Sequence, residues 1–353
     1  MKAVSVILLS GFLTLGAAVC GAVEGAGNPA TAIDPLDLLP GGLPGLAYMN
    51  LKHLAETGAY DNVMDFVASQ LEEPDKDPRE ILKALKLDIK KDLNAGALAF
   101  ESIGKDDAKL ILVVTGSFDT RTFYKVMKER EPRARTVFHK GHKIRLENDG
   151  KARAVLNGKV LITGTEDLVR KVIDIYKGDA KPGAKNSPLM DRAKGLGDQT
   201  FWLVADLNIP PQPEGEDPGL ATTIPGLDSS KIKTVTISGR ITGEAFDIKA
   251  VLGCVDAGSA ATLVGGLSQA VNRWVAMSTM ATAGDPESAQ TVIELTQAMD
   301  INSEGASATV RVTITAELAE KLKALGEKMI ETQGFDGGGM MGPGGMMEMD
   351  GAD

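Results

Sequence analysis

The sequence predicts an α+β fold built from two duplicated domains, each a largely antiparallel sheet with helices packed on one face. Three observations favour it: apolar strands alternate with turns of hairpin length, amphipathic helical runs lie between the hairpins, and this order occurs in both halves of the chain. With 353 residues and 43% hydrophobic content, the chain is long enough to form two domains with hydrophobic cores.

The duplication is predicted from three pairs of similar segments. Each pair holds the same place in the order of strands, hairpins and helices, although the loops between them differ in length. A chance likeness between two α+β domains is the alternative interpretation. The matched segments are 47–51 with 203–207, the strand ending at Phe118 and Asp119 with the one ending at Val255 and Asp256, and 160–168 with 310–318.

The N-terminus has the layout of a secretory signal peptide over residues 1–22. Lys2 precedes an uncharged, largely apolar stretch, and small residues follow it, so cleavage is expected after Ala22. The stretch is short for a membrane span, and no later segment is long or apolar enough to be one. We expect an exported protein, periplasmic or extracellular, with lipid anchoring at Cys20 as the alternative.

Composition divides the rest of the chain. A Gly-, Ala- and Pro-rich linker is expected at 23–44, and a Gly-, Lys- and Pro-rich stretch at 177–197 marks the domain boundary. The first α+β repeat then covers 45–195 and the second 198–333. The Gly- and Met-rich tail, 334–353, is expected to be disordered because its low-complexity sequence cannot build a core.

Local signals predict the elements of the first repeat in order. Asp119 and Thr165 are expected helix N-caps, and Lys140-Gly141 and Asn157-Gly158 are expected two-residue hairpin turns. The expected strands are 46–51, 95–103, 109–118, 136–139, 142–146 and 152–162, the last folded into a hairpin; the expected helices cover 61–71, a run from Pro78, and the runs after Asp119 and Thr165.

The second repeat begins near Thr200. Helices are expected over 259–275, over 286–298 and through Leu318, Leu322 and Leu325, and a Pro-rich stretch at 210–213 replaces the early helices of the first repeat. Function is expected where the two copies differ.

Charge and cysteine content exclude several classes. A net charge of −10 argues against nucleic-acid binding and disfavours docking on anionic lipid. The basic run 130–145, which includes Arg133, Arg135, Lys140, Lys143 and Arg145, is expected to form a solvated hairpin face. After signal cleavage Cys254 is the only cysteine, so no intramolecular disulfide can form, and its apolar neighbours predict a small buried side chain.

Two patterns suggest metal chemistry, and in both a simpler interpretation is preferred. His139 and His142 flank a two-residue turn and should be cross-strand neighbours on one face, but zinc needs a third or fourth ligand and the only other histidine is His53. The methionines of the tail could bind Cu(I), or could make apolar contacts with a partner; they are Met340, Met341, Met346, Met347 and Met349.

Catalytic motifs are absent from the sequence. The acidic pairs Asp106-Asp107 and Glu72-Glu73 are adjacent residues whose carboxylates point apart, and no phosphate-binding loop or serine nucleophile elbow occurs. We therefore predict no catalytic, cofactor-binding or metal-binding residues and no cofactor.

The phrase Leu38-Leu39-Pro40, followed by Ala47-Tyr48 and a strand, resembles the opening of an uncharacterised family of exported bacterial proteins. The resemblance covers roughly residues 38–330 and implies an exported, non-enzymatic protein of unknown role. We expect a binding or scaffolding module of the cell envelope, whose partner is an unknown envelope protein or ligand. The alternatives are a carrier of a small or apolar ligand in the cleft between the domains, and a hydrolase with an unrecognised site. The sequence sets no oligomeric state.

Overall fold

A computed structural model describes residues 33–57, 83–101, 109–148, 150–207, 229–243, 245–281 and 285–333. The predicted signal peptide, the helix expected over 61–71, both acidic pairs and the tail 334–353 lie outside the described residues. Of the helical run expected from Pro78, residues 83–85 are described and helical, and Leu85 is buried.

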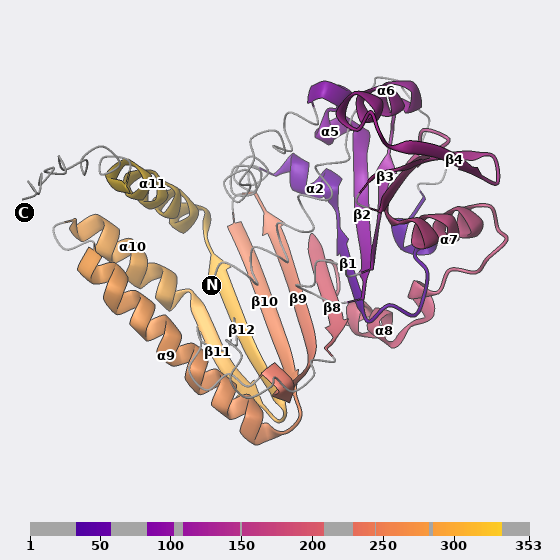
Figure 1. The fold of residues 1–353 in the computed structure, drawn as a ribbon. Coiled ribbons are helices and arrows are strands. Elements are labelled where there is room, and N and C mark those ends of the chain that lie inside the picture. The colour runs from indigo at the N-terminus through magenta and orange to yellow at the C-terminus, as the bar shows by residue number, and fades with distance from the viewer. Residues whose placement is uncertain are drawn as a thin grey trace, which may run out of the picture.

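The described strands form a single antiparallel sheet of 12 strands (Figure 1). Its order is β11-β12-β10-β9-β8-β1-β2-β3-β7-β6-β5-β4. The strands are β1 (Gly45–Met49), β2 (Leu93–Phe100), β3 (Leu110–Gly116), β4 (Arg135–His139), β5 (His142–Leu146), β6 (Lys151–Leu156), β7 (Val160–Thr165), β8 (Phe201–Asp206), β9 (Ile232–Thr242), β10 (Ala245–Cys254), β11 (Met299–Glu304) and β12 (Ser307–Ile314).

Helices precede, separate and follow these strands in the chain, which confirms an α+β fold. They are η1 (Pro35–Leu38), α2 (Leu51–Glu56), α5 (Ile89–Asp92), α6 (Thr120–Arg130), α7 (Glu166–Tyr176), η3 (Ala184–Asn186), α8 (Pro188–Lys194), η4 (Ser229–Lys231), α9 (Ala257–Ala281), α10 (Pro286–Gln297) and α11 (Ala316–Gln333).

The two predicted domains share this one sheet, which corrects the expectation of a separate sheet in each. The reason is that β1 pairs with β2 on one side and with β8 on the other, so the main-chain ladder runs through the middle without a break. At this junction the rings of Tyr48 and Trp202 stack with centroids 5.8 Å apart.

From this junction outward, both halves have the same strand order. One half reads β1-β2-β3-β7-β6 and the other β8-β9-β10-β12-β11, and the three segment pairs noted in the sequence fall on or just after β1 and β8, β3 and β10, and β7 and β12. The first half adds the β4–β5 hairpin at its outer edge. Duplication of the sequence itself stays a prediction.

Helices lie on both faces of the first half, which corrects the expectation of helices on one face. Alternate strand residues project to opposite faces, and each set has its own helices. Phe123 and Met127 of α6 and Leu263 of α9 share a core with Leu112 and Leu203. On the other face, η1, α7 and α8 pack on alternate residues of the same strands, with Leu36, Leu168, Val172 and Leu189 among the buried side chains.

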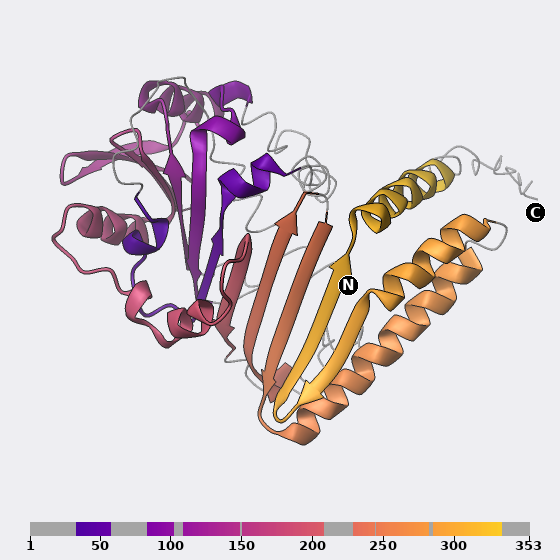
Figure 2. The same cartoon turned by 180° about the vertical axis from the view of Figure 1, so that it is seen from behind.

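In the second half the helices cover one face, as predicted. Helix α9 lies beside this part of the sheet and contacts β10, β11 and β12 (Figure 2). Helix α11 joins α10 through a Lys321–Glu294 ion pair of 2.8 Å. The opposite face of the same strands is polar, and Arg311 pairs there with Asp247 across β12 and β10.

Many local predictions are confirmed. As the N-cap of α6, the Asp119 carboxylate accepts a hydrogen bond from the main-chain amide of Arg121. In the β6–β7 turn, Asn157 and Gly158 both have positive φ. Thr165 precedes α7, but its hydroxyl donates to Asp167 instead of capping the helix. Residues 33–44 are not a linker throughout, because Leu36, Leu38 and Leu39 are buried.

Candidate functional site

The β4–β5 hairpin carries the histidine pair, and its turn is encoded locally. Lys140 and Gly141 both have positive φ, 47° and 82°, as a two-residue type I′ turn requires, and glycine adopts that conformation without steric cost. The register places His139 opposite His142 on the two strands, which confirms that they are cross-strand neighbours.

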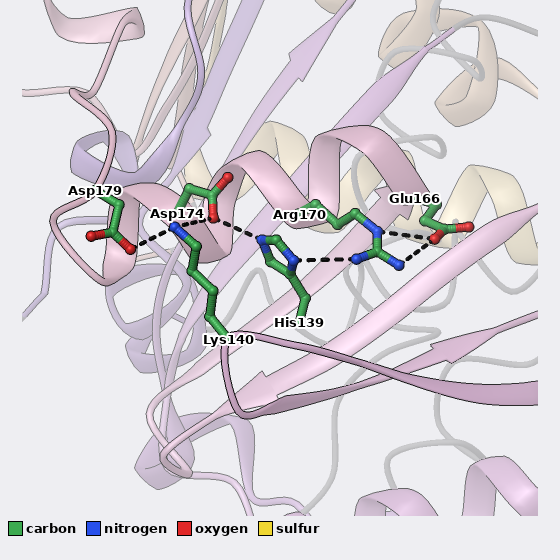
Figure 3. Close-up of polar contacts among 6 residues, drawn as sticks. All are labelled: His139, Lys140, Glu166, Arg170, Asp174 and Asp179. Carbon is green, nitrogen blue, oxygen red and sulfur yellow. Dashed lines mark hydrogen bonds and ion pairs between the residues drawn. The ribbon is translucent and has the colours of Figure 1, made fainter.

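His139 lies between two charged residues of α7 (Figure 3). Its Nε2 is 2.7 Å from Asp174 Oδ1, and its Nδ1 is 3.2 Å from Arg170 Nη1. Arginine can only donate, so Nδ1 must accept, and the ring proton is therefore on Nε2, which donates to Asp174. Both ring nitrogens are thus occupied.

The ion pairs around His139 hold the hairpin against α7. Lys140 Nζ lies 3.0 Å from Asp174 and 2.5 Å from Asp179, and Arg170 pairs with Glu166 at 2.6 Å. Partial burial acts to raise the pKa of Asp174, but the hydrogen bonds from Lys140 and His139 together lower it. The carboxylate of Asp174 therefore joins both residues of the hairpin tip to the helix.

His142 has a different environment from His139. The residue is 9% exposed, and its ring packs edge-to-face with the Tyr176 ring, with centroids 5.9 Å apart. Burial, followed by the charge of Lys177, lowers its pKa, and its Nε2 is buried with no hydrogen-bond partner among the described residues.

The three histidines do not converge on one point. Asp174 and Arg170 hold His139, Tyr176 covers His142, and His53 in α2 bonds the carbonyl of Ile241 in β9 at 2.9 Å. Within the described ranges, no group of three or more His, Cys, Asp or Glu is placed to hold a metal ion.

The other face of the hairpin contains buried charge, which corrects the expectation of a fully solvated basic face. Arg145 is buried and donates to the carbonyl of Glu131, and the nearby Arg153 pairs with buried Glu147 at 2.9 Å. Lys143 lies over the ring of Tyr124 at 4.3 Å.

Tyr124 connects α6 to this part of the sheet. Its hydroxyl donates to the Lys143 carbonyl at 2.5 Å and accepts from the Val155 amide at 3.3 Å. Burial raises the pKa of Tyr124 to about 12, while the bond from Val155 acts in the opposite direction. The hairpin is therefore fastened on one face to α7 and on the other to α6.

Among the described residues, no strand lies beyond the outer edge of β4. Within the part of the chain that the structure describes, β4 pairs with β5 alone and is the last strand of the sheet. Phe138 projects from it with 69% of its surface exposed, the second most exposed large apolar side chain described. Arg133 and Arg135 are exposed beside it and have no ion-pair partner among the described residues.

The sequence predicts the hairpin, its turn and the histidine pair, but the exposure of Phe138 was not predicted. A signal was present, because Val137 and Phe138 are adjacent apolar residues in an alternating strand and must project to opposite faces. Val137 packs on the α7 side, so Phe138 is the residue left on the outside of that core.

Cys254 contacts the core beneath α9 but is only partly buried. Burial raises the pKa of its thiol, and Asp256 adds to that effect. A raised pKa disfavours the reactive thiolate, consistent with the predicted packing role. No helix within the described ranges is both long and apolar enough to cross a membrane.

Comparison with known proteins gives little information. No protein-family model matches the chain, and no curated protein matches it. Crystal forms I and III of TP0453 are similar solved structures, with TM-scores of 0.47 and 0.48 and identities of 11% and 12%, each covering 83% of this chain and 98% of the other. At these values, function must be argued from the chain's own residues.

Proposed function

We propose that this protein is a non-enzymatic binding or scaffolding module of the cell envelope. The observation that carries the proposal is the state of His139, the residue whose pattern most invited a chemical role. Asp174 and Arg170 occupy both ring nitrogens, and no hydroxyl or thiol among the described residues bonds to the ring. A general base needs a free nitrogen within reach of the proton it abstracts, which is not offered here.

The same contacts suit a binding surface. The ion pairs to α7 and the Tyr124 bond to Lys143 fix the hairpin on both faces. The hairpin also presents a strand edge that no described strand pairs with, and an exposed phenylalanine. A rigid surface loses little conformational entropy when a partner binds, which favours affinity.

The two alternatives receive less support. A carrier site between the predicted domains would need a cleft there, yet β1 and β8 are hydrogen-bonded neighbours whose side chains enter the cores on both faces. A hydrolase would need a group of reactive side chains, and Asp174 and Arg170 already engage both ring nitrogens of His139. Export and an envelope location rest on the signal peptide predicted at 1–22.

Affinity capture tests this function. The full chain, tagged at its C-terminus, would be expressed in its native cells and recovered from the envelope fraction after mild crosslinking. We expect a partner recovered in stoichiometric amounts. Recovery of the chain alone would contradict the proposal, and turnover of an ester, peptide or phosphate substrate by the purified protein would favour the hydrolase instead.

A further inference from the structure

We propose that the free edge of β4 binds an extended, acidic segment of a partner protein, which adds to the sheet as a further strand. The inference rests on the proposed binding function and names the chemistry of its partner. Main-chain pairing at an open sheet edge is an established way to recognise peptides, because the main-chain groups supply affinity and side chains supply specificity.

The register shows which main-chain groups of β4 are available. In the type I′ turn the carbonyl of His139 accepts from the amide of His142, so these groups point toward β5. Main-chain groups alternate along an antiparallel strand, so those of Val137 also face β5 and those of Thr136 and Phe138 face outward. Two amides and two carbonyls are therefore directed at the position of an added strand.

The side chains at this edge favour acidic residues. Lys140 is paired with Asp174 and Asp179, which leaves Arg133 and Arg135 as exposed cations next to the free edge, without described partners. The chain as a whole carries a net charge of −10, so this edge is a local exception. Carboxylates on the incoming strand would pair with the two guanidinium groups, and Phe138 would cover an apolar residue on it.

A second copy of this chain is a poorer occupant. If β4 paired with its own copy, the arginines of both strands would be brought together, and like charges across a strand pair are destabilising. Basic residues on an edge are also a common protection against self-association. The same charges that discourage another β4 attract an acidic strand.

The test uses short fluorescent peptides and the full chain. One peptide alternates glutamate with valine, a matched peptide carries lysine in place of glutamate, and a third repeats the acidic sequence with alternate amides methylated. We expect fluorescence anisotropy to show binding of the acidic peptide alone. Equal binding of all three peptides, or binding of none, would overturn the inference.

Variants then locate the binding. Phe138→Pro removes an outward amide without touching the β5 ladder and should weaken the acidic peptide at least about tenfold, equal to about 1.4 kcal/mol. Phe138→Ala keeps the amide and should have a smaller effect. The double variant Arg133→Glu, Arg135→Glu should abolish the preference for the acidic peptide over the lysine peptide. The control is Lys128→Glu, which changes an exposed charge on α6 and should leave that preference unaltered.

Folding and the two proposals can be separated. Circular dichroism checks that each variant folds, and if Phe138→Pro does not, the methylated peptide tests the same hydrogen bonds on the unaltered protein. If the envelope partner is still captured by Phe138→Pro in normal amounts, the β4 inference is wrong and the binding function stands. If no partner is captured by either form, the binding function fails as well.

Discussion

His139 shows how a residue that attracts a chemical interpretation in sequence can have a structural role. The prediction of its neighbour His142 was correct because a two-residue turn fixes cross-strand partners locally. Asp174 and Arg170, which occupy its nitrogens, lie 35 and 31 residues further along the chain. No local pattern predicts that α7 returns to this hairpin, so the constellation could not be assembled from sequence.

Asp174 should make the stability of the protein depend on acidic pH. Because its pKa is lowered in the fold, its contribution is complete above the ordinary aspartate pKa of about 3.9 and is lost as the pH falls through the lowered value. Asp174→Ala should cost about 1 kcal/mol near neutral pH, and the difference from the unaltered protein should shrink in acid. Urea unfolding across this range measures both; a difference that does not vary with pH would contradict the assignment.

His142 should make the stability of the protein depend on pH in a higher range than Asp174 does. Its lowered pKa means that the unfolded chain takes up a proton first, so stability falls as the pH drops below about 6.5 and levels off once the folded-state ring is also protonated. His142→Phe keeps an aromatic ring against Tyr176 and should remove this part of the slope. The test compares thermal midpoints of the two proteins at neutral and mildly acidic pH, and parallel curves would refute it.

At the scale of elements, the hairpin turns and the Asp119 cap of α6 were predictable because each depends on a few adjacent residues, whereas the expected Thr165 cap of α7 does not form. The environment of the charges on those elements was not. Arg145 and Arg153 are directly opposite each other on β5 and β6, a like-charged pair that sequence alone suggests should face water. Arg153 can be buried because it pairs with Glu147, and Arg145 because it donates to the carbonyl of Glu131 at the end of α6. Both contacts depend on tertiary packing.

Removal of Glu147 should therefore be costly. Glu147→Ala leaves the two arginines without the carboxylate that pairs with Arg153, and we expect a loss of about 3 kcal/mol in the free energy of unfolding. Replacing Glu147 and Arg153 together by leucine and methionine should recover part of that loss, because no charge of the pair is then left alone. Chemical denaturation of the three proteins checks this, and an additive double variant would contradict it.

At the scale of the whole molecule, one sheet replaces the two that were expected. The sequence predicted the strands and their succession along the chain. The pairing of β1 with β8 was not predictable, because it joins residues about 155 positions apart, from Gly45 with Ala205 to Met49 with Phe201, and no local sequence pattern indicates it. The free β4 edge could not be predicted from the sequence either, because an edge is defined by the absence of a neighbouring strand in the assembled sheet.

A continuous sheet should unfold as one unit. Trp202 sits at the junction against Tyr48, and replacing the only other tryptophan, Trp274, by phenylalanine makes its fluorescence a reporter of the junction. We expect the fluorescence and far-ultraviolet circular dichroism transitions to coincide in urea. Two separated transitions would show that the halves unfold independently.

The most direct test of the β4 binding surface is amide hydrogen exchange at Thr136 and Phe138. In the free protein these outward amides should exchange rapidly, while those of Val137 and His139, bonded to β5, are protected. The acidic peptide should slow exchange at Thr136 and Phe138 and leave the other two unchanged. Unaltered exchange at both outward amides in the bound protein would contradict strand addition at β4.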